Sequence, residues 1–107
     1  MKAAYLILLA MFASLLIGCQ HTVRTSDNYR PHTGYVPNPE TAVQIAEAVL
    51  LPIYGKEQVE SERPFVANLN GDIWTVEGSL PDGWLGGVAE VDIRKSDGKI
   101  MRLIHGE

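Results

Sequence analysis

The sequence predicts an α+β domain in which one N-terminal helix packs on a four-stranded antiparallel sheet. Apolar residues recur at helical spacing between residues 39 and 54, and apolar and polar residues alternate with a period of two from residue 65 onward. Turn residues separate the alternating segments. Because the apolar stripe of the helix has only the sheet to pack against, a two-layer domain follows.

The helix has a strong start signal in Asn38-Pro39-Glu40-Thr41, with a capping residue, a proline at the first helical position and an acid in the first turn. The predicted apolar stripe comprises Ala42, Ile45, Ala46, Val49 and Ile53. Pro52 cannot donate a backbone N–H, so we expect the helix to stop or kink near Leu51. One further turn should end at Gly55.

Four strands are expected after a charged connector over residues 56–63. The first runs from Phe65 to Leu69, and Asn70-Gly71 is a strong hairpin signal before a return strand over 73–76. A loop over 79–87 leads to the third strand, VAEVDIRK, and Ser96-Asp97-Gly98 turns the chain into a last strand over 100–104. The expected topology is a meander.

Composition limits the classes of function. The chain has 107 residues, of which 46% are hydrophobic and 21% charged, as in one small globular domain. Its 9 Lys and Arg residues against 13 Asp and Glu residues give a net charge of −4 and no basic stripe. Nucleic acid is therefore not an expected partner. A single cysteine also excludes an internal disulfide.

Residues 1–18 are typical of a targeting signal. Lys2 gives a positive start, and an uncharged apolar run follows over residues 3–17. That run of about 15 residues is shorter than the ~20 needed for a helix that spans a bilayer. A signal peptide is therefore favoured over a permanent transmembrane helix.

Leu16-Ile17-Gly18-Cys19 resembles the lipobox of bacterial lipoproteins. The resemblance implies cleavage between Gly18 and Cys19, lipid attachment to the Cys19 thiol and acylation of the new N-terminus. Several acyl chains give stable membrane anchoring where one chain does not. Gln20 is not the aspartate that commonly retains lipoproteins at the inner membrane, so the periplasmic side of the outer membrane is favoured.

The polar segment over residues 19–36 contains scattered Pro, Gly, Ser and Thr without periodicity, which is typical of a flexible tether. The predicted organisation is thus a signal peptide over 1–18, a tether over 19–36 and a folded domain over 37–107.

No catalytic site, metal site or cofactor is predicted. His21 and His32 lie in the tether, and we expect His105 on the surface at a strand end. Glu60 and Glu62 fall in the connector. The protein is therefore not expected to be an enzyme.

Four residues are candidates for binding a partner: Asp82, Trp84, Glu90 and Asp92. Glu90 and Asp92 should share the solvated face of a strand with Arg94, and their charge suits a basic partner. Trp84 lies between flexible glycines, either as an interface anchor or folded back over the core. Trp74, in the middle of a strand, is expected in the core.

The region from about Pro37 to Gly106 resembles the bacterial immunity proteins with a nuclear-transport-factor-2-like (cystatin-like) fold. The matching segments are VPNPETAVQIAEAVLLPIYG, RPF, GDIWTVEGSLP and GGVAEVDIRKSDGKIMRLIHG. The resemblance implies a curled sheet and a protein that binds and neutralises a cognate toxin. With the lipoprotein signal, it implies that this happens in the periplasm.

Two other readings stay open. The helix followed by VAEVDIRKSDGKIM resembles the PepSY domains thought to restrain proteases. Larger members of the cystatin-like fold class hold small ligands in a cone-shaped pocket, but a single helix and a short sheet leave little wall for one. A deep pocket lined by polar groups would favour that function.

Overall fold

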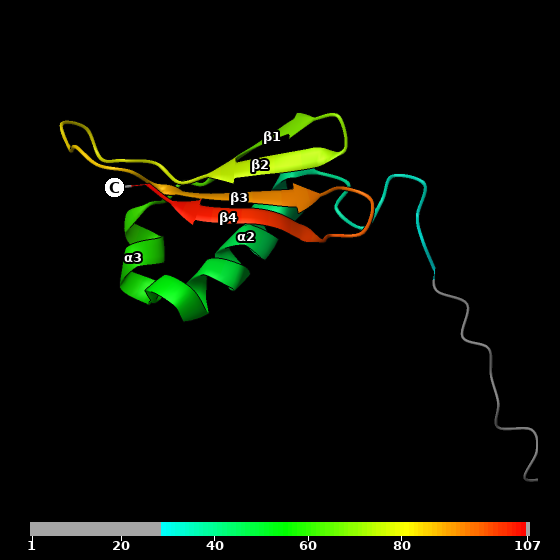
Figure 1. Ribbon diagram of the computed structural model, residues 1–107, viewed down its shortest axis with the longest axis horizontal. Helices are drawn as coiled ribbons and strands as arrows, with labels where there is room; N and C mark the ends of the chain where they lie inside the picture. The colour runs from blue at the N-terminus through cyan, green and yellow to red at the C-terminus, as the bar shows by residue number, and fades with distance from the viewer. Residues whose placement is uncertain (1–28, 107) are drawn as a thin grey trace, which may run out of the picture.

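The computed structural model describes residues 29–106, which form two layers (Figure 1). Helix α2 (Pro39–Tyr54) lies across one face of a sheet, and the short helix α3 (Lys56–Ser61) follows it at one end. The strands are β1 (Val66–Asn70), β2 (Ile73–Glu77), β3 (Ala89–Arg94) and β4 (Ile100–His105). Their order is β1-β2-β3-β4 and all neighbours are antiparallel. The predicted α+β meander is confirmed.

Helix α2 begins as its sequence predicts but ends later than Pro52 suggested. The Thr41 amide and hydroxyl both donate to Asn38 Oδ1, at 2.9 and 2.7 Å. At the other end the helix continues through Pro52 to Tyr54, and the Gly55 N–H donates to the Leu51 carbonyl at 2.9 Å. The helix therefore does not stop near Leu51, and the expected end at Gly55 is confirmed.

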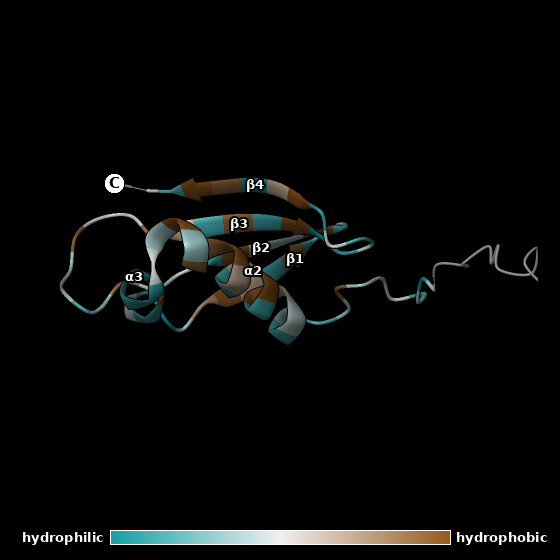
Figure 2. Cartoon of the chain, turned by 90° about the horizontal axis from the view of Figure 1, so that it is seen from below, coloured by the Kyte–Doolittle hydropathy of each residue, from teal (hydrophilic) through white to brown (hydrophobic). Residues whose placement is uncertain are grey.

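The core lies between α2 and the sheet. The helix contributes Ala42, Ala46 and Leu50, which are spaced four residues apart and lie along one line. Among the described residues the buried hydrophobic side chains are Val36, Ala42, Ala46, Leu50, Val59, Phe65, Trp74, Val76, Ala89, Val91 and Ile93. Helix α2 is correspondingly a mixture of hydrophobic and hydrophilic segments (Figure 2). The predicted stripe is therefore displaced at its end: Leu50 is buried, whereas Ile53 is exposed.

Helix α3 was missed by the sequence analysis, which expected a charged connector there. It has six residues, and Val59 is the one residue of α3 that is buried. A single apolar side chain in one and a half turns leaves no periodic signal, so only the packing of Val59 into the core reveals the helix.

The β1–β2 turn lies one residue later than the Asn70-Gly71 signal suggested. Asn70 pairs with Ile73 at the end of the ladder, so Gly71 and Asp72 form the turn. Gly71 has a φ of +62°, which suits a two-residue hairpin with glycine at its first central position. The predicted turn after β3 is present, with Gly98 donating to the Arg94 carbonyl at 2.8 Å.

The folded domain begins before Pro37, where the sequence placed the end of the tether. The amides of Tyr35 and Val36 donate to the carbonyls of Ser96 and Lys95 at 3.1 and 3.0 Å. Val36 is completely buried, and its carbonyl accepts a 2.8 Å hydrogen bond from Trp74 Nε1. Residues 34–36 therefore form a strap that docks at the β3–β4 turn. The predicted signal peptide, Gly18, Cys19 and tether residues 19–28 lie outside the described residues.

Neither α2 nor α3 has the length and apolar character that a helix needs to cross a bilayer.

The β3–β4 turn contains a carboxylate, Asp97, whose contacts should make the stability of the domain depend on pH in acid. Arg94 donates to both carboxylate oxygens of Asp97, at 2.9 and 2.5 Å, and the Lys99 amide donates to it at 3.0 Å. These bonds hold the pKa of Asp97 well below its ordinary value of 3.8. A lowered pKa contributes stability that is present above pH 3.8 and is lost as the pH falls through the folded-state pKa.

We therefore expect Asp97→Asn to lower the melting temperature at neutral pH and to flatten its decline below about pH 4. Thermal unfolding followed by circular dichroism across this pH range tests the expectation. Asp82→Asn is the matched control, because within residues 29–106 Asp82 makes no side-chain hydrogen bond or ion pair. If the melting temperature of Asp97→Asn fell as steeply with pH as that of wild type, the expectation would be wrong.

Candidate functional site

The loop over residues 78–88, between β2 and β3, projects from one end of the sheet (Figure 1). Its tip carries two apolar side chains in water: Trp84 is 70% exposed and Leu85 is 99% exposed. Of the two readings of Trp84, the one that folds it over the core is wrong. Trp74, by contrast, is buried as predicted.

The two ends of this loop are held firmly. The Ser79 amide donates to the Glu62 carbonyl at 2.7 Å, and its hydroxyl donates to the Pro64 carbonyl at 2.6 Å. The Gly78 amide donates to the Ala89 carbonyl at 2.9 Å. At the far end, a Cβ on Gly87 would lie 2.1 Å from the Gly106 backbone, so that close approach requires glycine.

A depression of about 350 Å³ lies between this loop and α3. Leu80, Pro81 and Trp84 line it from the loop, and Gln58, Ser61 and Glu62 line it from α3 and the residue that follows. The loop therefore offers an apolar wall that faces a polar helix end.

Glu62 is the buried acid beneath this depression, with only 4% of its surface exposed. Its Oε1 accepts a 2.6 Å hydrogen bond from the Ala89 amide, and its Oε2 accepts one of 3.1 Å from the Gln58 side chain. His105 Nε2 also lies 3.2 Å from Oε2. The carboxylate thus joins the end of α3 to the start of β3 and the end of β4.

His105 is held by three neighbours. Its Nδ1 lies 2.7 Å from the Gly106 carbonyl oxygen, its Nε2 faces Glu62, and its ring lies 5.0 Å from the Tyr54 ring between centroids. His105 therefore lies at a strand end, as expected, but it is partly buried against Glu62 and Tyr54, with 24% of its side chain exposed. Because neither pattern nor spacing marks Glu62 and His105, 43 residues apart, only the folded chain reveals the pair.

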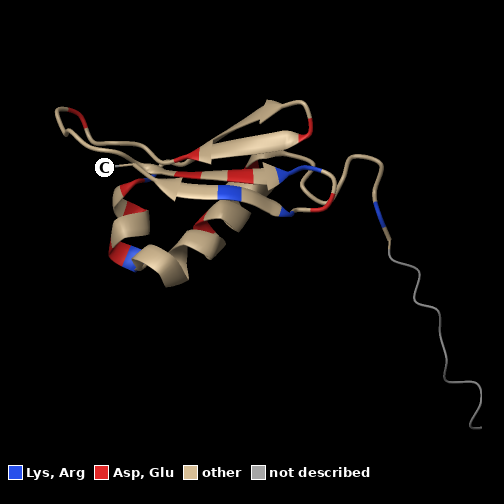
Figure 3. Cartoon of the chain, viewed as in Figure 1, with Lys and Arg blue, Asp and Glu red and all other residues tan. Residues whose placement is uncertain are grey.

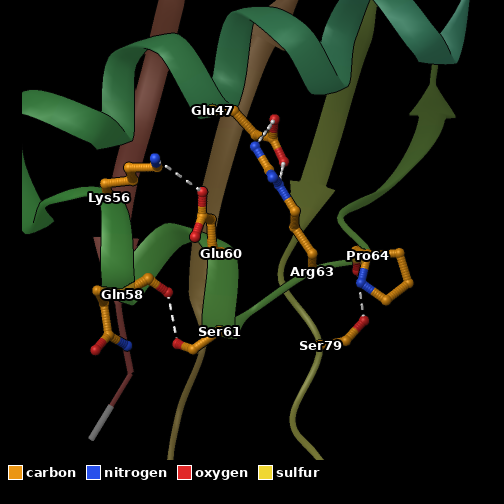
Figure 4. Close-up of polar contacts among 8 residues, drawn as sticks. All are labelled: Glu47, Lys56, Gln58, Glu60, Ser61, Arg63, Pro64 and Ser79. Atoms are coloured by element: carbon orange, nitrogen blue, oxygen red, sulfur yellow. Dashed lines mark hydrogen bonds and ion pairs between the residues drawn. The ribbon is translucent and has the colours of Figure 1, made fainter.

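Further polar contacts lie within α3 and between Arg63, which follows it, and α2 (Figure 4). Arg63 forms a two-pronged pair with Glu47, at 2.8 and 3.2 Å, which raises the pKa of the guanidinium. Lys56 lies 3.8 Å from Glu60, and the Ser61 hydroxyl donates to the Gln58 carbonyl at 2.6 Å. The helix that borders the depression is therefore joined to the main layer.

Glu90 and Asp92 lie on the outer face of β3, away from α2. Arg102 on β4 pairs with both, at 3.1 Å in each case, and its pKa is raised by the hydrogen bond to Asp92 and the charge of Glu90. The Thr75 hydroxyl also donates to Asp92 at 2.8 Å. These two acids therefore share one arginine as their counter-charge on the sheet.

The structure thus separates the four candidate partner-binding residues into two pairs. Asp82 and Trp84 share the projecting loop, whereas Glu90 and Asp92 belong to the sheet cluster with Arg102. Among the described residues, no three His, Cys, Asp or Glu side chains gather as metal ligands would.

Comparison with known proteins places this architecture in a family. The model of the NTF2 fold immunity protein family matches residues 41–107, which cover α2 from Thr41 onward, α3 and the whole sheet. The chain belongs to this family. The match agrees with the resemblance seen in the sequence and supports an immunity function in general.

Two relatives of this immunity protein occur in Escherichia coli K12, and both are uncharacterized. YhhH is 30% identical over 95 residues, which cover 83% of this chain and 75% of YhhH. YbbC is 34% identical over 67 residues, which cover 62% of this chain and 55% of YbbC. The chain therefore spans about half of YbbC. No solved structure matches the chain.

Proposed function

We propose that this protein is a lipid-anchored immunity protein that binds and neutralises a cognate toxin on the periplasmic side of the membrane. The observation that carries the proposal is membership of the immunity family over residues 41–107. Immunity proteins act by binding their toxin, so the surface of the domain rather than a catalytic centre performs the function.

The polar groups at the candidate site fit a binding role. Glu62 is the buried carboxylate there, and its oxygens are occupied by Ala89, Gln58 and His105 of the same chain. A carboxylate with its lone pairs already committed stabilises the fold and is poorly placed to take a proton from a substrate. Inhibition through an exposed surface accounts for the arrangement without a reaction.

The anchoring part of the proposal rests on Leu16-Ile17-Gly18-Cys19 and Gln20. A protein held by lipid at Cys19 in the outer membrane would meet toxins that arrive from outside or act in the envelope. A toxin that acts in the cytoplasm would already have passed it.

Cell experiments test both parts. Where a toxin gene lies beside this gene, its product is directed to the periplasm of cells that carry either the wild-type protein or Cys19→Ser. We expect wild type to incorporate labelled palmitate, to fractionate with membranes and to preserve growth. Cys19→Ser should lose the label and the membrane association.

Different failures remove different parts of the proposal. Recovery of wild type in the cytoplasm with an unmodified Cys19 would remove the anchor. A labelled, membrane-bound wild type that gives no protection would remove the immunity role. A neighbouring peptidase or sensor gene in place of a toxin gene would instead favour protease restraint.

A further inference from the structure

We infer that the toxin docks on the end of the domain formed by α3 and the 78–88 loop, where it inserts an apolar side chain flanked by Lys or Arg. This inference rests on the proposed immunity function and adds the interacting surface and the chemistry of the partner.

The first argument is the exposed apolar surface. Leu80, Trp84 and Leu85 are all exposed, and Trp84 and Leu85 are neighbours at the loop tip. Leu80 and Trp84 border the 350 Å³ depression against α3. An exposed tryptophan beside a pocket large enough for one side chain is the usual composition of an interface hot spot.

Charge also distinguishes this end of the domain. Glu57 and Glu60 belong to α3, Asp82 belongs to the loop, and Glu77 ends β2 where the loop begins. Acidic segments are visible on α3 and in the loop (Figure 3), and the one basic residue of α3, Lys56, is already 3.8 Å from Glu60. Glu57, Glu77 and Asp82 are exposed and form no ion pair within residues 29–106. A partner with Lys or Arg around its apolar contact would complement this rim.

The third argument is the construction of the loop. Its base is fixed by the bonds of Gly78 and Ser79, whereas Gly83 and Gly86 both have positive φ at the tip. The base of the loop is therefore held at a defined place, and Trp84 and Leu85 at its tip stand in water. A fixed base reduces the entropy that the loop loses on binding.

The two ends of the sheet also differ in charge. The strap over residues 34–36 docks at the β3–β4 turn, at the end of the sheet opposite the loop (Figure 1). Arg30 and Lys95 border one depression there together with Asp72, Lys99 precedes β4, and both basic and acidic segments are visible at this end (Figure 3). A chain anchored through its N-terminus would therefore turn this mainly basic end toward anionic lipid and the loop that carries Asp82 away from it. This arrangement favours a protein partner for the loop over the membrane.

Binding of the purified cognate toxin, defined as the one against which the protein protects cells, to the full chain in detergent tests the inference. We expect Trp84→Ala to raise the Kd by about 30-fold or more. Met101→Ala, which removes an exposed apolar side chain from β4, is the matched control and should change the Kd by less than about threefold. The urea midpoint of each variant verifies that it is folded.

A second arm tests the charge of the partner. Glu57→Lys combined with Asp82→Lys should slow association about tenfold at low salt, and the difference should shrink as salt is added. Lys99→Glu, at the opposite end of the sheet, should leave the association rate unchanged.

The outcomes separate the inference from the proposed function. If wild type does not bind the toxin, the immunity role fails and the docking surface with it. If wild type binds and Trp84→Ala binds equally well, only the docking surface is overturned.

Two further results would also overturn the docking surface. One is self-association in sedimentation that Trp84→Ala abolishes, because the loop would then serve a second copy. The other is Trp84-dependent binding of Cys19→Ser protein to phosphatidylethanolamine–phosphatidylglycerol vesicles, because the loop would then serve the membrane.

Discussion

Glu62→Ala is expected to lower the free energy of unfolding by about 3 kcal/mol, the largest effect of any polar substitution in the domain. The substitution removes the acceptor of the Ala89 amide and the partner of both Gln58 and His105. It leaves a buried backbone N–H without a partner at the start of β3, which costs far more than the loss of an exposed hydrogen bond.

Two variants make the result specific to the buried carboxylate. Glu62→Gln retains an acceptor for the Ala89 amide, so we expect a smaller loss of about 1 kcal/mol. Glu60→Ala removes an exposed acid of α3 two residues before Glu62 and should change stability by less than about 0.5 kcal/mol. Urea unfolding followed by circular dichroism measures all three. A midpoint for Glu62→Ala equal to that of Glu60→Ala would show that the cluster does not anchor the fold.

Trp74→Ala should destabilise the domain by about 4 kcal/mol, because it empties a large site in the centre of the core. Trp74 is only 6% exposed and lies on β2 between β1 and β3. Trp74→Phe refills most of the space but loses the 2.8 Å bond from Nε1 to the Val36 carbonyl, so it should cost about 1–2 kcal/mol.

Hydrogen exchange distinguishes the two roles of Trp74. In Trp74→Phe the amides of Tyr35 and Val36 should exchange faster, since the indole no longer holds the strap, while the β2–β3 amides stay protected. Trp84→Phe is the control for changing a tryptophan, and its exposed site predicts no change in stability or exchange. Unaltered exchange at Val36 in Trp74→Phe would mean that the backbone bonds to Lys95 and Ser96 suffice to hold the strap.

Local chemistry allowed much of the fold to be predicted. Asn38 and Pro39 mark the start of α2 because a helix cap needs only residues that are close in sequence. The Thr41 amide donates the hydrogen bond that the Asn38 side chain accepts. The strands were recognisable because one buried face imposes a period of two, as Val91 and Ile93 alternate with Asp92 on β3. The position of Trp84 between glycines also identified the loop.

The elements that the sequence did not reveal depend on contacts between distant segments. Helix α3 contains one buried residue, Val59, and so has no periodicity to detect. Burial of Val36 depends on Trp74, which is 38 residues away in the chain. The pairing of Glu62 with His105 requires α3 and β4 to meet.

The sequence alone therefore determined the α+β class, the meander of strands and the family, because each follows from patterns within short windows. The tertiary structure decided which charges matter and where. Glu90 and Asp92 are compensated by Arg102, Glu62 is buried in the framework, and Asp82 stands free with Trp84 on the loop within the described chain. The spacing of apolar residues and the capping and turn residues are local properties of the sequence. Burial and charge pairing arise only when the two layers come together.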